Sequence, residues 1–106
     1  MRCRAVRLIV YFDLPVKTAD DRRQYSRFHK YLLMQGFVMM QESIYSKIAL
    51  NSTAADAIKS NLRANKPRTG NVQILSVSER QYQSIECLVG EINKEVVDTL
   101  DRFVVL

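Results

Sequence analysis

The sequence contains no tryptophan, a single histidine and only two cysteines, and these shortages exclude several kinds of site. Cys3 and Cys87 have no Cys-x-x-Cys or Cys/His spacing, so neither a zinc site nor a redox motif is predicted, and both are expected to be reduced, small apolar residues. His29 has no second histidine with which to build a catalytic or metal cluster, and we interpret it as a helix-flank residue. There is also no glycine-rich phosphate loop.

Glycine and proline are scarce as well, with 3 and 2 residues, which argues against long disordered linkers. A chain of 106 residues fits one hydrophobic core, so a single domain covering residues 1–106 is predicted. The first apolar run ends at Phe12 with no small-residue cleavage pattern after it. Neither a signal peptide nor a membrane span is therefore expected, and we predict a cytoplasmic protein with no membrane partner.

Acidic residues are fewer than basic ones: the sequence has 11 Asp and Glu but 16 Lys and Arg, which gives a net charge of +5. This excess favours a polyanionic partner such as nucleic acid or an anionic membrane surface. Contact with phosphates would be independent of sequence and sensitive to salt. The alternative is a solvated helix face, the commonest fate of such charges. The candidate nucleic-acid-binding residues are Arg22, Arg23, Arg27, Lys30, Lys59, Arg63, Lys66 and Arg68.

Hydrophobic periodicity and turn residues predict six main elements. Thr18 and Asp21 have the spacing of a helix cap, and Thr53 with Asp56 repeats that spacing before the second helix. Alternating polar and apolar residues indicate half-buried strands. The expected order is a strand at 6–13, a helix at 18–35, strands at 37–40 and 43–50, a helix from 51 that ends before Pro67, and a strand at 72–77.

This order is the α+β, ferredoxin-like β-α-β-β-α-β arrangement, with both helices on one face of the sheet. The other face is left uncovered. Residues 84–106 are expected to form a C-terminal extension in which 87–90 and 102–106 add one or two strands used in dimer or partner contacts. An uncovered face and extra apolar strands favour a homodimer.

Asp13 is the first candidate for chemistry, because it ends the apolar run of residues 6–12 just before Leu14 and Pro15. Hard cations such as Mg²⁺ prefer carboxylate oxygens, and a strand end holds one rigidly. One carboxylate makes a poor metal site, but two Asp13 side chains across a dimer, with water and substrate phosphate, would suffice for phosphodiester cleavage. Alternatively, Asp13 is a turn residue that accepts backbone hydrogen bonds. The residues alone leave both interpretations open.

Several motifs together closely resemble one family, the smaller of the two universal CRISPR spacer-acquisition proteins. They are YFDLP at 11–15, DRRQYSRF at 21–28, GF at 36–37 and QESIY at 41–45. The resemblance runs over nearly the whole chain. The segments NSTAAD at 51–56 and NKP at 65–67 look most like members from type II systems, which use a single large effector nuclease.

The resemblance implies a ferredoxin-like homodimer that lies between dimers of the CRISPR integrase and holds duplex DNA as a scaffold. It also implies a Mg²⁺-dependent endonuclease acting on DNA or single-stranded RNA, with Asp13 as metal ligand and catalytic residue at the dimer interface. Arg22, Arg23, Phe37 and Ser43 match positions near that site in the family. The alternatives are a toxin-like ferredoxin-fold ribonuclease and a non-catalytic nucleic-acid-binding module.

Overall fold

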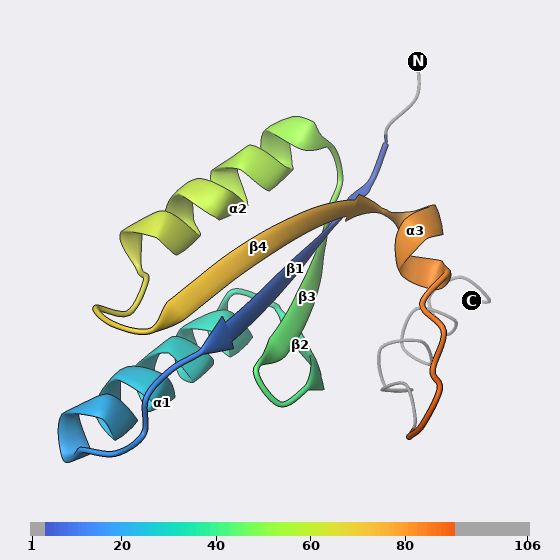
Figure 1. Ribbon diagram of the computed structural model, residues 1–106. Helices are drawn as coiled ribbons and strands as arrows, with labels where there is room; N and C mark the ends of the chain where they lie inside the picture. The colour runs from blue at the N-terminus through green and yellow to red at the C-terminus, as the bar shows by residue number, and fades with distance from the viewer. Residues whose placement is uncertain (1–3, 91–106) are drawn as a thin grey trace.

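The computed structural model describes residues 4–90, and within them two long helices pack against one face of a four-stranded sheet (Figure 1). The strands are arranged in the order β2-β3-β1-β4, and every neighbouring pair is antiparallel. This topology confirms the predicted ferredoxin-like order and adds one short helix after the last strand. The elements are β1 (Val6–Asp13), α1 (Ala19–Met34), β2 (Val38–Gln41), β3 (Ile44–Ala49), α2 (Ser52–Ala64), β4 (Asn71–Ser78) and α3 (Glu79–Gln83).

β1 is the central strand, and its alternating side chains define the two faces of the sheet. Leu8, Val10 and Phe12 are buried beneath α1 and α2. The residues between them point to the opposite face, because successive side chains of a strand alternate. In register, Ile9 pairs with Leu75 of β4, and Asp13 pairs with Asn71 at the far end of the same ladder.

The core is built around Phe12, whose ring meets aromatic side chains from two other elements. It lies edge-on to Phe28 of α1 at 5.2 Å between ring centroids and stacks on Tyr45 of β3 at 5.6 Å. Burial is the main reason that the pKa of Tyr45 is raised. The Tyr45 hydroxyl forms a 2.5 Å hydrogen bond with Nδ1 of His29, so the single histidine belongs to the helix flank, as expected. These contacts fix the sheet against α1.

The N-cap of α1 is the one that the sequence predicts, whereas the N-cap of α2 is a different residue. Thr18 and Asp21 form the predicted capping box. At α2 the prediction that Thr53 is the cap is wrong, since Asn51 fills this role by accepting a 2.8 Å hydrogen bond from the Ala54 amide. Asparagine is among the strongest N-cap residues, and Thr53 lies already inside the first turn. No helix within residues 4–90 combines the length and hydropathy needed to cross a membrane.

α3 is the element that the sequence did not predict. Ser78 caps it through a second capping box with Gln81. The helix lies on the sheet face opposite α1 and α2, where Tyr82 places its ring 4.1 Å from the Arg7 guanidinium. The prediction of a strand at 87–90 is wrong, because the chain there is irregular and bent. The strand predicted at 102–106 lies outside the described residues.

Candidate nucleic-acid interface and acidic strand end

Asp13 is an exposed residue at the end of β1, on the sheet face that α1 and α2 do not cover. Its neighbours form a shallow hollow of about 280 Å³ that collects side chains from three strands and the β2–β3 turn. One further carboxylate, Glu42, belongs to this hollow. The lining residues are Tyr11, Phe12, Asp13, Glu42, Ser43, Ile44, Asn71 and Gln73.

The β2–β3 turn holds Ser43 beside the end of β1. Ser43 adopts a left-handed backbone with φ of +67°, which is unusual for a residue other than glycine. Its carbonyl accepts a 3.1 Å hydrogen bond from the Phe12 amide, and this bond ties the turn to β1 next to Asp13. Phe37, in contrast, is a core residue that is 3% exposed and does not line the hollow. The structure therefore brings Ser43, but not Phe37, to Asp13.

The donors in this hollow suit a hard cation but are few. Asp13 and Glu42 offer carboxylate oxygens, the ligand type that Mg²⁺ prefers. Within residues 4–90, no group of three or more Asp, Glu, His or Cys side chains gathers closely enough to hold a metal ion. Within the described chain the hollow thus presents two carboxylates, Asp13 and Glu42.

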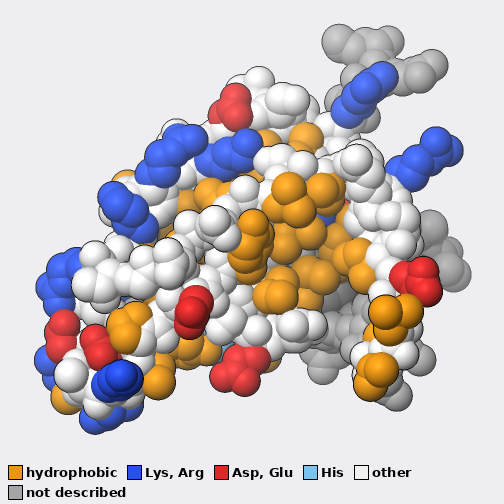
Figure 2. Space-filling model, in the orientation of Figure 1, with side chains coloured by type: hydrophobic (Ala, Val, Ile, Leu, Met, Phe, Trp, Pro, Cys, Tyr) orange, Lys and Arg blue, Asp and Glu red, His pale blue; other side chains and the backbone are white. Residues whose placement is uncertain are grey.

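An apolar surface adjoins Asp13 on the uncovered sheet face. Tyr11, Val38 and Leu75 are 38%, 37% and 48% exposed, respectively, although all three are strand residues. Figure 2 shows hydrophobic side chains gathered over the middle of the sheet, with Lys and Arg spread along the margin over α2 and the start of α1. Exposed apolar patches of this kind commonly mark interaction surfaces. Asp13 therefore lies at the edge of a surface suited to contact with another chain.

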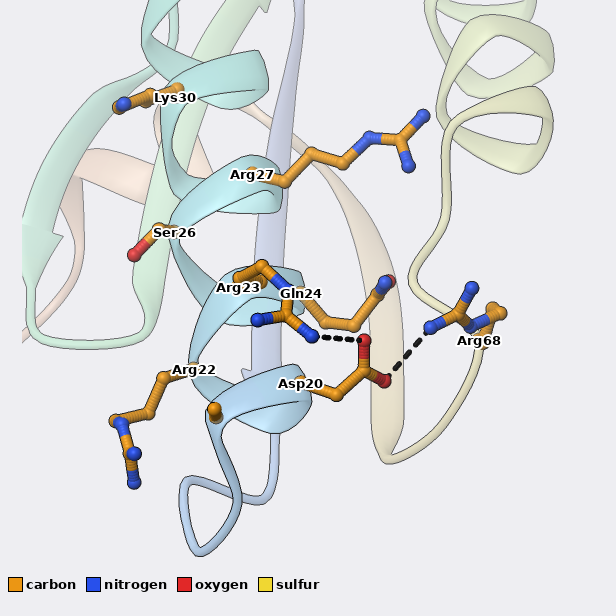
Figure 3. A pocket seen from close by; sticks show the side chains of 9 residues that line it. Asp20, Arg22, Arg23, Gln24, Ser26, Arg27, Lys30 and Arg68 are labelled. Carbon is orange, nitrogen blue, oxygen red and sulfur yellow. Dashed lines mark hydrogen bonds and ion pairs between the residues drawn. The ribbon is translucent and has the colours of Figure 1, made fainter.

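The second site is an open groove of about 800 Å³ along α1 from Ala19 to Lys30, beside the turn that leads into β4. Arg23 comes from α1 and Arg68 from this turn, and Figure 3 shows both guanidinium groups directed at Asp20. The distances are 3.3 Å from Arg23 and 2.8 Å from Arg68. Hydrogen bonding to Arg68, aided by Arg23, lowers the pKa of Asp20 below its usual value. Two sequence-distant cations thus meet at one carboxylate.

The other basic residues predicted to bind nucleic acid point in different directions, and some of them already bond to the backbone. Arg27 reaches toward the α2–β4 turn, whereas Lys30 points to the other side of α1 (Figure 3). Arg22 donates hydrogen bonds of 3.3 and 3.1 Å to the carbonyls of residues 16 and 17, so its guanidinium fastens the loop before α1. Lys66 donates to the carbonyl of residue 63, and Lys59 and Arg63 lie on α2 without lining the groove. Arg22 and Lys30 also line the groove, but Arg23, Arg27 and Arg68 are the basic residues on the side that faces the α2–β4 turn.

Two acidic residues of these sites were not among the predicted ones. Asp20 has Arg23 three residues later on the same helix, a spacing that indicates an ion pair and could have identified it. Its bond to Arg68 spans 48 residues and has no local signal. Glu42 joins Asp13 only through the β2–β3 turn.

Comparison with known proteins gives concordant matches in sequence and in structure. The family model described as CRISPR associated protein Cas2 matches residues 6–85. A Treponema denticola protein named CRISPR-associated endoribonuclease Cas2 is 48% identical over 101 residues, 95% of this chain and 100% of the relative. A Streptococcus mutans protein of the same name is 40% identical over 95% of this chain and 93% of its own length. A solved structure titled "Crystal structure of cas2" superposes with a TM-score of 0.56 at 18% identity, covering 84% and 91% of the two chains, and supports the fold.

Proposed function

From the membership of this chain in the CRISPR-associated Cas2 family, we propose that it is a CRISPR adaptation protein that binds nucleic acid along its α1 groove and acts as a homodimer. In this role it holds duplex DNA as a scaffold for the CRISPR integrase. The single observation that carries the proposal is the convergence of Arg23, Arg27 and Arg68, from two distant segments, on one open groove. Phosphates are the ligands that such a groove fits best.

The dimer is proposed from the uncovered sheet face. Its apolar centre, which includes Tyr11 and Leu75, needs a partner surface of similar character, and a second copy offers one through two-fold symmetry. Asp13 lies at the border of the same face, so a two-fold axis near it would bring two Asp13 side chains together. The dimer and the acidic site are therefore linked in this proposal.

Endonuclease activity is proposed at the same place, where two Asp13 side chains would meet across the dimer interface. The Treponema denticola and Streptococcus mutans relatives carry the name endoribonuclease, which favours RNA as a substrate beside duplex DNA. Asp13, with Glu42 nearby, would hold Mg²⁺, and a bound Mg²⁺ polarises a phosphodiester and lowers the pKa of water. This chain contributes the two carboxylates and the adjoining apolar surface, which would place the site at the interface of the proposed dimer. No observation favours a toxin-like ribonuclease over this function.

The binding proposal is tested by neutralising the groove. Arg23→Gln/Arg27→Gln is expected to weaken binding of a short DNA duplex at least tenfold and to flatten its salt dependence, because each lost phosphate contact removes about 0.9 from the slope of log K against log salt. Lys59→Gln/Arg63→Gln is the matched control, since it removes the same charge from α2 outside the groove. Equal losses in the two variants would show that net charge, rather than the groove, binds DNA.

The scaffold role is tested with the integrase of the same system. Co-purification of the full chain with that integrase and a duplex is expected, and the groove variant should lose the duplex while it keeps the protein contact. If the protein binds duplex but never associates with the integrase, the adaptation role is overturned and the non-catalytic nucleic-acid-binding module is favoured instead. Growth arrest on expression without the integrase would favour the toxin-like ribonuclease instead.

A further inference from the structure

Asp20 differs in charge from the basic residues that surround it in the α1 groove. It is the one acidic residue among the described residues that line it, and each of its two carboxylate oxygens accepts a hydrogen bond from a different arginine. Oδ1 accepts from Arg23 and Oδ2 from Arg68 (Figure 3). The two arginines that could best clamp an anion between α1 and the α2–β4 turn are therefore already engaged by an anion of the protein itself.

A phosphodiester presents the same feature to arginine as a carboxylate, namely two oxygens that share one negative charge. We propose that Asp20 is an internal competitor of the nucleic-acid phosphate, which holds Arg23 and Arg68 in the free protein and gives them up when a phosphodiester enters the groove. This inference rests on the proposed nucleic-acid binding and deepens it. It assigns one phosphate position to the arginine pair and a controlling residue to that position.

The exchange is feasible because the pair is exposed. The side chains of Asp20, Arg23 and Arg68 are 52%, 70% and 67% exposed, and ion pairs in such surroundings contribute little stability. Both arginines can therefore swing from carboxylate to phosphate without opening the core. The Asp20 carboxylate is charged at neutral pH, like any ordinary aspartate, and the two arginines lower its pKa further, so the competition persists under the conditions in which DNA binds.

Competition of this kind selects ligands by the number of their phosphates. A single free phosphate must displace Asp20 with no other contact to gain. A strand can also place neighbouring phosphates near Arg27, which lines the groove, and near Lys66, in a smaller hollow that shares Arg27 and Arg68 with the groove. Arg27 has no salt bridge to any residue in the range 4–90, so its charge is available from the start. Displacing Asp20 costs both ligands the same free energy, but only a continuous strand has further phosphate contacts that keep it bound.

The test compares the full chain with Asp20→Asn in titrations of a labelled DNA duplex at several salt concentrations. The variant is expected to bind three- to tenfold tighter, with a salt slope steeper by about one phosphate contact. Asp21→Asn is the matched control, because it makes the same charge change one residue away while its amide oxygen can still accept the Thr18 capping bond. It is expected to change affinity less than twofold. Asp20→Ser, with a thermal melt of each variant, provides a second substitution that suits the first helical turn.

A second comparison separates competition from general electrostatics. In an Arg23→Gln/Arg68→Gln background, Asp20→Asn should give no gain, since no arginine is left to release. Weaker binding by Asp20→Asn would show that Asp20 orients the arginines, and unchanged binding would show that it does not compete; either result overturns the proposal while the groove remains a nucleic-acid site. Full affinity in the Arg23→Gln/Arg68→Gln variant and in Arg27→Gln would instead remove the proposed nucleic-acid site.

Discussion

Arg7, near the start of the central strand β1, is held by Glu79 at the start of α3 through a two-pronged ion pair. Nε donates to Oε1 at 2.6 Å and Nη2 donates to Oε2 at 2.9 Å. The Arg7 side chain is 3% exposed and the Glu79 side chain 32% exposed, so the arginine depends on this carboxylate and on the Tyr82 ring for compensation of its charge. The pair fastens α3 to the face of the sheet that the other helices leave open.

Removing one partner of this pair should therefore be costly. Glu79→Gln is expected to lower the free energy of unfolding by about 1–3 kcal/mol, less than for a fully buried pair because water reaches Glu79. Urea unfolding measures the change. Glu86→Gln, at an exposed position that follows α3, serves as the control and should leave stability within about 0.5 kcal/mol. Equal stability of the two variants would mean that the Arg7 pair does not hold α3.

The cap of α2 can be tested with two neighbouring substitutions. Asn51→Ala should cost about 1 kcal/mol because the Ala54 amide loses its acceptor, whereas Thr53→Ala should cost little or even stabilise the helix. Thermal or urea unfolding of both variants decides between the two capping residues. A larger loss for Thr53→Ala would restore Thr53 as the cap.

Gly70 lies in the turn before β4, with φ of +91° and close against the end of β1. A Cβ atom there would come within 2.7 Å of Leu14 Cδ2 and 2.9 Å of the Asp13 carbonyl oxygen. Gly70→Ala is expected to destabilise the protein by about 2–4 kcal/mol, combining backbone strain with overpacking. Gly90→Ala is the matched control, since Gly90 has a φ of +94° but no neighbouring atom of the described chain within 4 Å. Similar unfolding curves for the two variants would show that the contact with β1 yields easily.

The proposed nuclease chemistry predicts a separation of cleavage from binding. Asp13→Asn should reduce Mg²⁺-dependent cleavage of RNA or duplex DNA by about 100-fold or more, while duplex affinity stays within twofold, because the groove lies on α1. Asp56→Asn on α2 removes the same charge from an exposed helix position as a control. Spacer acquisition that survives in the Asp13→Asn variant would show that the scaffold does not need this carboxylate.

If the dimer forms through the uncovered sheet face, a charge introduced on that face should weaken dimerisation. Leu75→Glu should shift the protein toward the monomer by at least tenfold in dissociation constant, since a carboxylate would be buried in the apolar interface. Leu33→Glu on α1 is closely matched, because Leu33 is 47% exposed and Leu75 48%. Sedimentation equilibrium measures both. Dissociation by Leu33→Glu alone would place the interface on the helical side.

How far the sequence predicts this structure depends on how local each interaction is. The alternation in β1 and the capping pair Thr18 and Asp21 are local, and both are confirmed. α3 was missed because five residues are too few for a periodic signal, and Arg7 gave no hint of a partner 72 residues away. The sites follow the same rule. The exposed position of Asp13 at a strand end could be predicted, while its proximity to Glu42 required the fold.

α3 also sets a limit on how another chain could approach the sheet. It covers the Arg7 end of β1 and leaves free the stretch from Ile9 toward Asp13. In the proposed dimer, α3 would therefore limit how far the second copy can extend along the strands toward Arg7, while leaving the opposite direction open. Because the Arg7–Glu79 pair holds α3 in place, a mutation of this pair is expected to change how the two copies of the proposed dimer align, even though the pair lies outside the apolar surface that they would share.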